Sequence, residues 1–365
     1  MTDKSHPDET VLTIVQGKGT LPREQAGRNI HYDDASLSNY KMVQKGDFII
    51  HLRSFEGGLE MANENGIVSP AYTILRGKKP HSSRFYEAYF HTDEFVNHVL
   101  AKSVEGIRDG RQISYDAFKW LGLPYCSPSE QAKIAELFSV LTKRIEKQTV
   151  LVGSLKKYKR GVVRSLLSPE NCKLKDAQWN RDTIGNLGSF IKGAPLSKAD
   201  ISTTGTPFIL YGELYTTYYE VITSVVRTTD AEVDSVYRSI VGDVLIPTSG
   251  ETPEEISTAS CVMLPGVILA GDLNIFRSSK VDGRIMSYIL NHIVNGCIAR
   301  LAQGKSIVHI QASEISKIEI SYPDPETQDR IVRVLEAISS RVEYCEKELD
   351  NLTKMRGSLL QQLFI

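Results

Sequence analysis

The chain has 365 residues, of which 41% are hydrophobic and 24% charged, and this provides enough apolar sequence for the cores of two or more globular domains. Its formal net charge of −1 excludes a surface that binds polyanions everywhere, so any contact with nucleic acid has to be local. The longest apolar run, Cys261–Ala270, contains a proline and is much shorter than the roughly 20 residues of a membrane helix. The start MTDKSHPDET is polar, so we expect neither a membrane span nor a secretory signal, and the expected location is the cytoplasm.

Residues 1–125 alternate short apolar runs with clusters of Gly, Pro, Asn and Ser, a pattern typical of a mixed α/β globular domain. Within this segment, KGDFIIHL at Lys45–Leu52 predicts a strand that is introduced by Gly-Asp and followed by a loop. Residues 1–125 are therefore expected to form a first domain.

A long helix is predicted within residues 126–170, with Ser129 as its N-cap. Its apolar residues alternate spacings of four and three, with Gln148 as the one interruption. They are Ile134, Phe138, Leu141, Ile145, Val152 and Leu155. The pattern covers about 36 residues, or about 54 Å, which is too long for a compact core and fits a paired strut. Two unrelated amphipathic surface helices are the alternative interpretation.

Basic residues also follow this first helix. They would suit DNA or an acidic partner, whereas a solvated helix face is the commoner meaning of such a run. The basic residues are Lys143, Arg144, Lys147, Lys156, Lys157, Lys159, Arg160 and Arg164.

Residues 171–322 repeat the mixed α/β pattern of the first domain. Here VGDVLIPT, Val241–Thr248, predicts a second strand introduced by Gly-Asp, at a position matching that of the first. The second domain has the longer start, because the first lacks a counterpart of WNRDTIGNLGSFIKGAPLSKAD. The first domain is therefore expected to be of a shorter type or truncated at its start.

A second long helix, predicted over residues 323–365, repeats the first. Arg356 interrupts its apolar row, and its start YPDPETQDRIVRVL matches YCSPSEQAKIAELF at an interval of 197 positions. The identical pairs are Tyr125/Tyr322, Pro128/Pro325, Gln131/Gln328 and Ile134/Ile331. This period equals a domain plus a connector. The predicted fold is mixed α+β: two similar globular domains separated by a long antiparallel two-helix coiled coil, with a pseudo-twofold internal repeat.

Catalytic and metal-binding patterns are not found. The segment ARLAQGKS, Ala299–Ser306, lacks the first glycine of a P-loop, and the histidines include no H-E-x-x-H pair. His91 and His98 are of a kind that is far more often exposed or at a core edge than bound to metal. The five cysteines are scattered and include no C-x-x-C pair, which argues against a disulfide framework and a zinc knuckle. The chain is therefore predicted to be non-catalytic and to hold no metal.

The repeated P-x-x-x-Q-x-x-I helix start, placed after each of two divergent domains, resembles the specificity (S) subunit of type I restriction-modification enzymes. The resemblance covers nearly the whole chain. Further phrases that fit the family are Ser38–Glu60 and Gly66–Arg76 in the first half, and Pro207–Glu220 and Gly242–Thr252 in the second. The resemblance implies a sequence-specific DNA-binding subunit whose two target-recognition domains read a bipartite target.

The resemblance also implies partners. These are double-stranded DNA, two methyltransferase (M) subunits and restriction/motor (R) subunits, with no membrane role. No cofactor is expected in this chain, whereas S-adenosylmethionine, ATP and Mg are expected on the partner subunits.

Loops after the two Gly-Asp strands are candidates for base reading, which needs donors and acceptors that reach a groove. Arg53 suits guanine, and Glu56 or Glu251 suits cytosine; plain solvent-facing turns are the alternative. The tyrosines of the second half would line a DNA face or pack a core, and Gly304–Ser306 would clamp a phosphate. The predicted DNA-binding residues are Lys18, Arg23, Arg53, Ser54, Phe55, Glu56, Gly57, Tyr211, Tyr215, Thr217, Tyr218, Tyr219, Thr248, Ser249, Gly250, Glu251, Thr252, Lys305 and Ser306.

Two other hypotheses stay open from the sequence. One is a non-catalytic coiled-coil adaptor that joins two protein-binding domains, which would show no preference for a DNA sequence. The other is an enzyme acting between the two domains, which would need a cofactor-dependent activity of the isolated chain.

Overall fold

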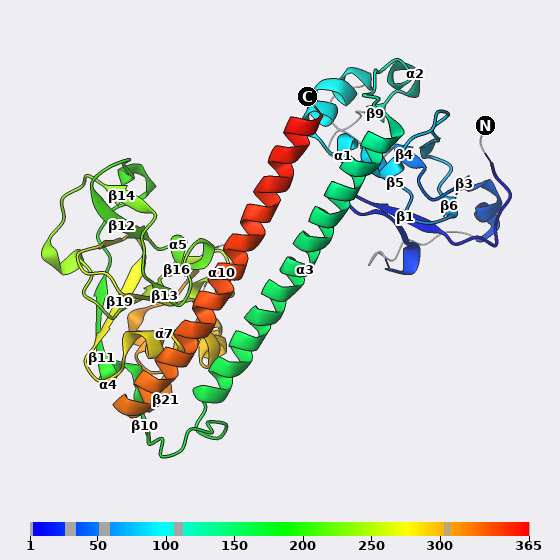
Figure 1. Ribbon diagram of the computed structural model, residues 1–365. Helices are drawn as coiled ribbons and strands as arrows, with labels where there is room; N and C mark the ends of the chain where they lie inside the picture. The colour runs from blue at the N-terminus through cyan, green and yellow to red at the C-terminus, as the bar shows by residue number, and fades with distance from the viewer. Residues whose placement is uncertain are drawn as a thin grey trace. The chain divides into compact units, whose positions relative to one another are not determined.

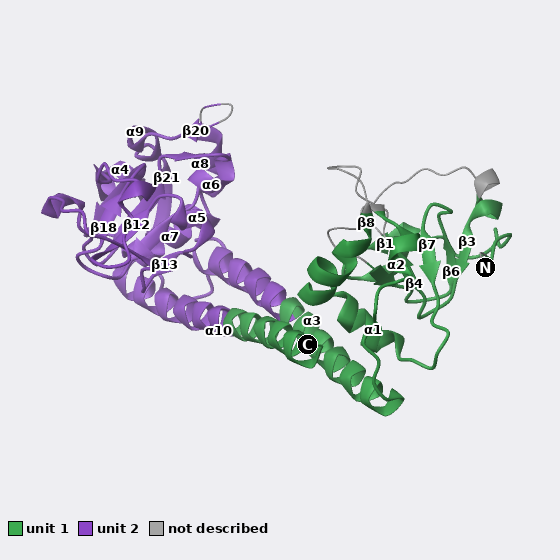
Figure 2. Ribbon diagram, turned by 90° about the horizontal axis from the view of Figure 1, so that it is seen from above, with its two compact units in different colours: residues 1–150, 345–365 green, residues 151–344 purple. Residues whose placement is uncertain are grey.

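The computed structural model describes residues 3–25, 34–50, 59–105, 112–302, 304 and 307–364. The chain divides into two compact units (Figures 1 and 2): unit 1 is residues 1–150 with 345–365, and unit 2 is residues 151–344. The predicted DNA-binding residues Arg53, Ser54, Phe55, Glu56, Gly57, Lys305 and Ser306 lie outside the described residues. Within the described part of the chain, no helix combines the length and apolar character that crossing a bilayer requires.

The two longest helices are copies of one another. Helix α3 is Pro128–Leu166 and helix α10 is Pro325–Leu363, each of 39 residues. Their first residues are prolines, which suit the first helical position because an N–H is not needed there. The N-cap of α3 is therefore the residue before the proline: Ser127 Oγ accepts a hydrogen bond from the N–H of Glu130 at 3.3 Å. The prediction of Ser129 as N-cap is wrong by two positions.

Each long helix contributes to the cores of both units. In unit 1, Phe138 of α3 packs with Phe364 beyond the end of α10, with ring centroids 6.2 Å apart, and both join the buried cluster of that unit. In unit 2, Val163 near the end of α3 and Leu335 near the start of α10 belong to one buried cluster. The helices therefore run antiparallel.

Unit 1 builds short strands and helices around these helix ends (Figure 1). The strands are β1 Leu12–Val15, β2 Gly19–Pro22, β3 Lys41–Val43, β4 Phe48–Ile50, β5 Leu59–Met61, β6 Gly66–Val68, β7 Thr73–Leu75, β8 Val104–Glu105 and β9 Gln112–Ile113. The helices are α1 Ser83–Phe90, α2 Tyr115–Phe118, a π-helical turn Glu94–Val99, and 3-10 turns Arg23–Gln25, Asp34–Asn39 and Leu100–Ser103.

Unit 2 is larger. Its strands are β10 Trp179–Thr183, β11 Gly188–Lys192, β12 Thr206–Leu210, β13 Val221–Ile222, β14 Arg227–Thr229, β15 Asp243–Pro247, β16 Ser249–Gly250, β17 Ser260–Val262, β18 Ile268–Ala270, β19 Leu273–Ser278, β20 Val308–His309 and β21 Glu319–Pro323. Its helices are α4 Ile184–Leu187, α5 Glu213–Thr216, α6 Pro253–Ile256, α7 Gly283–His292, α8 Asn295–Leu301 and α9 Ala312–Ile315, with 3-10 turns Lys198–Asp200 and Ser235–Tyr237.

One three-stranded antiparallel core occurs in both units. Its order is β5-β4-β7 in unit 1 and β17-β15-β19 in unit 2, where β11 and β13 extend the two edges. Strand β11 belongs to the segment that the sequence indicated has no counterpart in the first half. Among the described residues of unit 1, no strand pairs with β7 on the side where β11 pairs with β19.

The Gly-Asp pair that introduces β4 forms a tight turn. Gly46 has a φ of +93°, a conformation that favours glycine. The carboxylate of Asp47 is buried; it accepts the N–H of Gln44 at 2.8 Å and both guanidinium bonds of Arg76, at 2.7 and 2.6 Å.

The second Gly-Asp pair repeats this turn before β15. Gly242 has a φ of +96°, and Asp243 accepts the N–H of Ile240 at 2.9 Å and two bonds from Arg277, at 2.9 and 3.0 Å. The predicted matching strands are therefore confirmed, and the repeated aspartates close turns rather than face a ligand. Together with the two antiparallel helices, they bear out the predicted mixed α+β fold with an internal repeat.

A repeated glutamine joins the start of each long helix to the N-cap of a shorter helix in the same unit. Gln131 is buried, donates to the carbonyl of Cys126 at 3.0 Å and accepts the N–H of Ser82, the N-cap of α1, at 2.9 Å. Gln328 makes the same pair of bonds, donating to Pro323 at 2.8 Å and accepting from Asp282, the N-cap of α7, at 2.8 Å. This shared role explains why the glutamine occurs twice.

Candidate nucleic-acid interface

One concavity of unit 2 lies where β12 runs into α5. It encloses about 740 Å³. Its polar lining includes Lys198, Tyr211, Tyr215, Thr216, Arg227 and Asp272. These side chains come from four separate stretches of sequence, and the sheet brings them together because β12 pairs with both β14 and β18.

Two predicted tyrosines line this cavity. Both Tyr211 and Tyr215 are half-buried. Burial, together with the nearby carboxylate of Glu255, raises the pKa of Tyr215 above its ordinary value. The two rings therefore present an apolar face and a polar tip to the cavity.

Arg227 lies beside them and is held by a buried acid. Glu213, only 7% exposed at its side chain, forms an ion pair with Arg227 and accepts the N–H of Leu210 at 3.1 Å. The side chain of Arg227 remains 45% exposed. The guanidinium is thus fixed in place while part of it stays accessible to a ligand.

A second acid, Asp272, and Lys198 of the segment that unit 1 lacks also line the cavity. Ser249 Oγ donates to Asp272 at 2.7 Å. The lining therefore combines the acids Glu213 and Asp272 with the bases Lys198 and Arg227.

The other predicted tyrosines and threonines lie away from the cavity lining. Thr217 is exposed, and the hydroxyl of Tyr218 accepts the N–H of Val226 at 3.1 Å. Tyr219 lies over α3, with the ammonium groups of Lys156 and Lys159 each 5.8 Å from its ring centroid. Tyr219 thus contacts the basic face of the long helix.

The loop predicted after β15 is more ordered than its sequence indicated. Ser249 and Gly250 are buried and form strand β16, which pairs with β20. Thr248 donates its N–H to the backbone carbonyl of Asp272 at 2.8 Å, and Thr252 caps α6. Glu251 is exposed, and its charge acts on the nearby hydroxyl of Tyr215.

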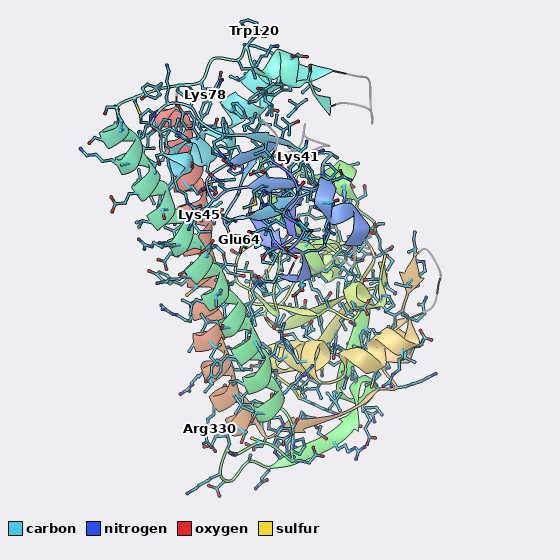
Figure 3. The ribbon with its side chains drawn as sticks, turned by 90° about the vertical axis from the view of Figure 1, so that its right-hand side faces the viewer. Lys41, Lys45, Glu64, Lys78, Trp120 and Arg330 are labelled. Atoms are coloured by element: carbon cyan, nitrogen blue, oxygen red, sulfur yellow. The ribbon has the colours of Figure 1, made fainter. Side chains whose placement is uncertain are left out.

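Unit 1 places its two described candidates on the β1–β2 hairpin. Lys18 is exposed in the turn, and Arg23 is half-buried where the hairpin ends. Figure 3 labels three further lysines of unit 1, Lys41, Lys45 and Lys78. The last two are exposed, whereas Lys41 Nζ donates to the carbonyl of Tyr72 at 2.6 Å.

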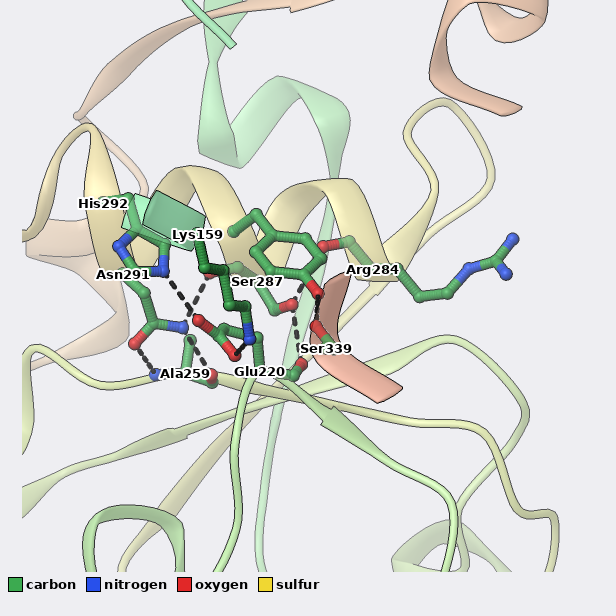
Figure 4. Close-up of polar contacts among 9 residues, drawn as sticks. Lys159, Glu220, Ala259, Arg284, Ser287, Asn291, His292 and Ser339 are labelled. Carbon is green, nitrogen blue, oxygen red and sulfur yellow. Dashed lines mark hydrogen bonds and ion pairs between the residues drawn. The ribbon is translucent and has the colours of Figure 1, made fainter. Parts of the chain in front are cut away.

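A largely buried ionic triad ties unit 2 to α3 (Figure 4). Glu220 accepts hydrogen bonds from Lys159 of α3 and from His292 of α7, both at 2.7 Å. Burial alone would raise the pKa of Glu220, but the bond from His292 and the charge of Lys159 outweigh it and lower the pKa from 4.5 to about 2. Glu220 ends the segment that carries Tyr211 and Tyr215, so the triad fixes that segment to the helix.

No cluster of three or more potential metal ligands occurs among the residues that the structure describes. The sequence also missed three residues of the cavity, Lys198, Arg227 and Asp272. They stand in unremarkable contexts, and only the pairing of strands brings them next to the tyrosines.

Comparison with known proteins finds a family model that matches part of the chain. Residues 177–354 match the model of the type I restriction modification DNA specificity domain. No curated protein matches the sequence.

Solved structures share the fold over the whole chain. The S subunit of a type I restriction-modification system from M. genitalium matches over 100% of this chain and 96% of its own, with 16% sequence identity and a TM-score of 0.62. A structure described as the basis of complex assembly and conformational transition of the type I R-M system matches over 100% and 94%, with 15% identity and a TM-score of 0.57. The resemblance drawn from the repeated helix start is thus confirmed, by family over residues 177–354 and by fold over the chain.

Proposed function

We propose that unit 2 reads one half of a bipartite DNA target through the cavity at Tyr211 and Tyr215, because residues 177–354 match the model of the type I restriction modification DNA specificity domain. The observation that carries this proposal is the convergence of donors and acceptors from four segments on one accessible concavity. A set of hydrogen-bond donors and acceptors can distinguish base edges in the major groove. A uniformly basic face would bind phosphates without distinguishing one base from another.

The chemistry of the cavity favours particular contacts. Arg227 is oriented by Glu213 and is partly exposed, which suits hydrogen bonding to guanine. Lys198 and the exposed Thr217 suit the phosphates beside the half-site. Unit 1 reads the other half-site with different chemistry, in which the exposed Lys18, Lys45 and Lys78 contact phosphates and Arg53 and Glu56 contact bases.

The chain acts within a larger complex. The long helices hold the two half-sites apart and bind two methyltransferase (M) subunits, and restriction/motor (R) subunits join them. S-adenosylmethionine, ATP and Mg belong to those partners, and the complex works where chromosomal DNA lies, in the cytoplasm. The domain limits for this arrangement are residues 1–125, 126–170, 171–322 and 323–365.

Methylation patterns test the proposal directly. The chain is expressed with a partner methyltransferase, and the methylated motif is determined by sequencing the host genome for modified adenines. We expect a bipartite motif, of which Arg227→Met changes or weakens one half-site only. The control is Arg181→Met, which removes an equal charge from β10, outside the cavity lining, where Arg181 pairs with Glu319. If Arg227→Met leaves the methylated motif unchanged, the proposed reading face is wrong.

A further inference from the structure

Related side chains of the repeat line a cavity in each unit. The cavity of unit 2 encloses about 170 Å³ and is lined by Lys159, Ser339 and Glu343 of the long helices. The cavity of unit 1 encloses about 300 Å³ and is lined by Arg356, Thr142 and Glu146 of the same helices. The members of each pair, taken in that order, are 197 positions apart. The two cavities are therefore the same place in the two copies of the repeat.

Each cavity is also lined by a histidine from a shorter helix of its unit. His292 is the last residue of α7 and lines the cavity of unit 2, and His91 is the C-cap of α1 and lines that of unit 1. In unit 2 the carboxylate of Glu220 lies between the histidine and Lys159, 2.7 Å from each. In the second copy, a carboxylate therefore satisfies both the cation of the long helix and the histidine.

In the first copy, Arg356 takes the place of Lys159, but no carboxylate of the described residues takes the place of Glu220. Arg356 makes no ion pair or hydrogen bond with any residue that the structure describes, and its Nε is buried. The acid nearest to His91, Glu60 at 3.6 Å, accepts the N–H groups of Gly17 and Gly19 and does not pair with Arg356. Glu220 immediately precedes β13, and the described residues of unit 1 form no strand corresponding to β13.

The acids already in the cavity of unit 1 do not replace Glu220. Glu87 pairs with Arg84 at 2.7 Å. Glu146 corresponds to Glu343, which is present in unit 2 in addition to Glu220. A buried guanidinium nitrogen without an acceptor carries a desolvation cost that an added acceptor relieves.

We propose that the cavity of unit 1 binds a carboxylate supplied by another molecule, in the place that Glu220 occupies in unit 2. The source is an acidic side chain of a partner protein of the complex. A carboxylate is the expected ligand because the equivalent place in unit 2 holds the carboxylate of Glu220 between the histidine and the cation of the long helix. Naming a methyltransferase subunit as the partner rests on the proposed function, whereas the site itself does not.

The site is tested on the full chain with acetate as the probe. With arginine labelled by ¹⁵N, the side-chain Nε–H signal of Arg356 is identified as the one absent from Arg356→Gln, and it is followed at constant ionic strength. We expect a saturable shift at millimolar acetate. The control Lys354→Gln, which removes a charge from the exposed face of the same helix, keeps the shift. A signal that does not move, or that responds more strongly to phosphate, overturns the carboxylate site.

The source is tested by assembly with the partner methyltransferase subunit. We expect Arg356→Gln to weaken assembly about tenfold or more, the range found when one member of a buried charge pair is removed, and Lys354→Gln to leave it unchanged. If the parent chain binds acetate but Arg356→Gln assembles normally, the ligand is not a side chain of the partner. The site would then be assigned to a free small carboxylate. DNA affinity, measured on the same proteins, reports on the proposed function separately, because neither variant lies in the cavity of unit 2.

Discussion

The side-chain amide of Gln148 in α3 donates to the backbone carbonyl of Cys345 in α10 at 2.9 Å, and these two residues are each other's counterparts, 197 positions apart. In an antiparallel pair built from a repeat, counterparts meet only at the centre of the pair. The bond between Gln148 and Cys345 therefore marks the centre of the repeat, and the glutamine that interrupts the apolar row is satisfied there.

This antiparallel register predicts that the helices act as a ruler. Four helix-forming residues are inserted between Val150 and Leu151 in α3 and after Tyr344 in α10. The insertions lengthen the pair by about 6 Å with about 40° of extra turn, which corresponds to one or two base pairs. We expect a longer gap between unaltered half-sites in the methylated motif. Changed half-sites across an unchanged gap would contradict the ruler.

Gln328 is predicted to stabilise unit 2 by holding Asp282, the N-cap of α7. Gln328→Leu leaves the N–H of Asp282 without its partner, and we expect a loss of about 2 kcal/mol in the free energy of unfolding. Urea unfolding measures this loss. The control Gln361→Leu changes an exposed position of the same helix and should stay within about 0.5 kcal/mol of the parent chain. Equal losses of stability in the two variants would contradict this role of the bond between Gln328 and Asp282.

The triad at Glu220 predicts a dependence of stability on pH. The pKa of Glu220 is lowered to about 2 in the folded chain, so its ionised form stabilises unit 2 above the ordinary pKa of about 4.3. This stabilisation, about 3 kcal/mol, is lost as the pH falls from about 4.5 toward 2.

Glu220→Gln should therefore be less stable than the parent chain at neutral pH, with the difference shrinking as the pH falls toward 2. Glu254→Gln, an exposed change in the same unit, serves as the control. Thermal unfolding across this pH range makes the measurement. A difference that is independent of pH would show that the ionised carboxylate is not the stabilising form.

The chain by itself is predicted not to methylate or cut DNA. The family model describes a DNA specificity domain, and the chemistry is proposed to belong to partner subunits. The measurement is transfer of labelled methyl groups to DNA by the purified chain, with and without the partner methyltransferase. Activity that persists after rigorous removal of partners would contradict the prediction.

The repeat could be predicted from sequence because both copies keep the same residues at one interval. The glutamines 131 and 328 stand out in the sequence, but their role does not, because their acceptor bonds come from Ser82 and Asp282, 49 and 46 positions away. The sequence likewise pointed to Tyr211 and Tyr215, and their partners in the cavity depend on strand pairing.

The loop after β15 shows a different limit. Ser249 and Gly250 have the composition of an open turn, but β20 pairs with them and buries them. A partner strand almost 60 positions away cannot be inferred from local turn chemistry. Tertiary pairing thus overrode the local signal, and the residues of that loop that stay exposed are Glu251 and Thr252.

The continuity of the long helices has a consequence for folding. Phe138 and Val163 lie on one uninterrupted helix, although the first is buried in unit 1 and the second in unit 2. Each core needs one end of α3 and the opposite end of α10 to be helical, and a helix propagates more readily than it nucleates. Formation of either core therefore extends helix toward the other. The two units should unfold as one cooperative transition, and a fragment that ends in the middle of α3 should lose much of its stability.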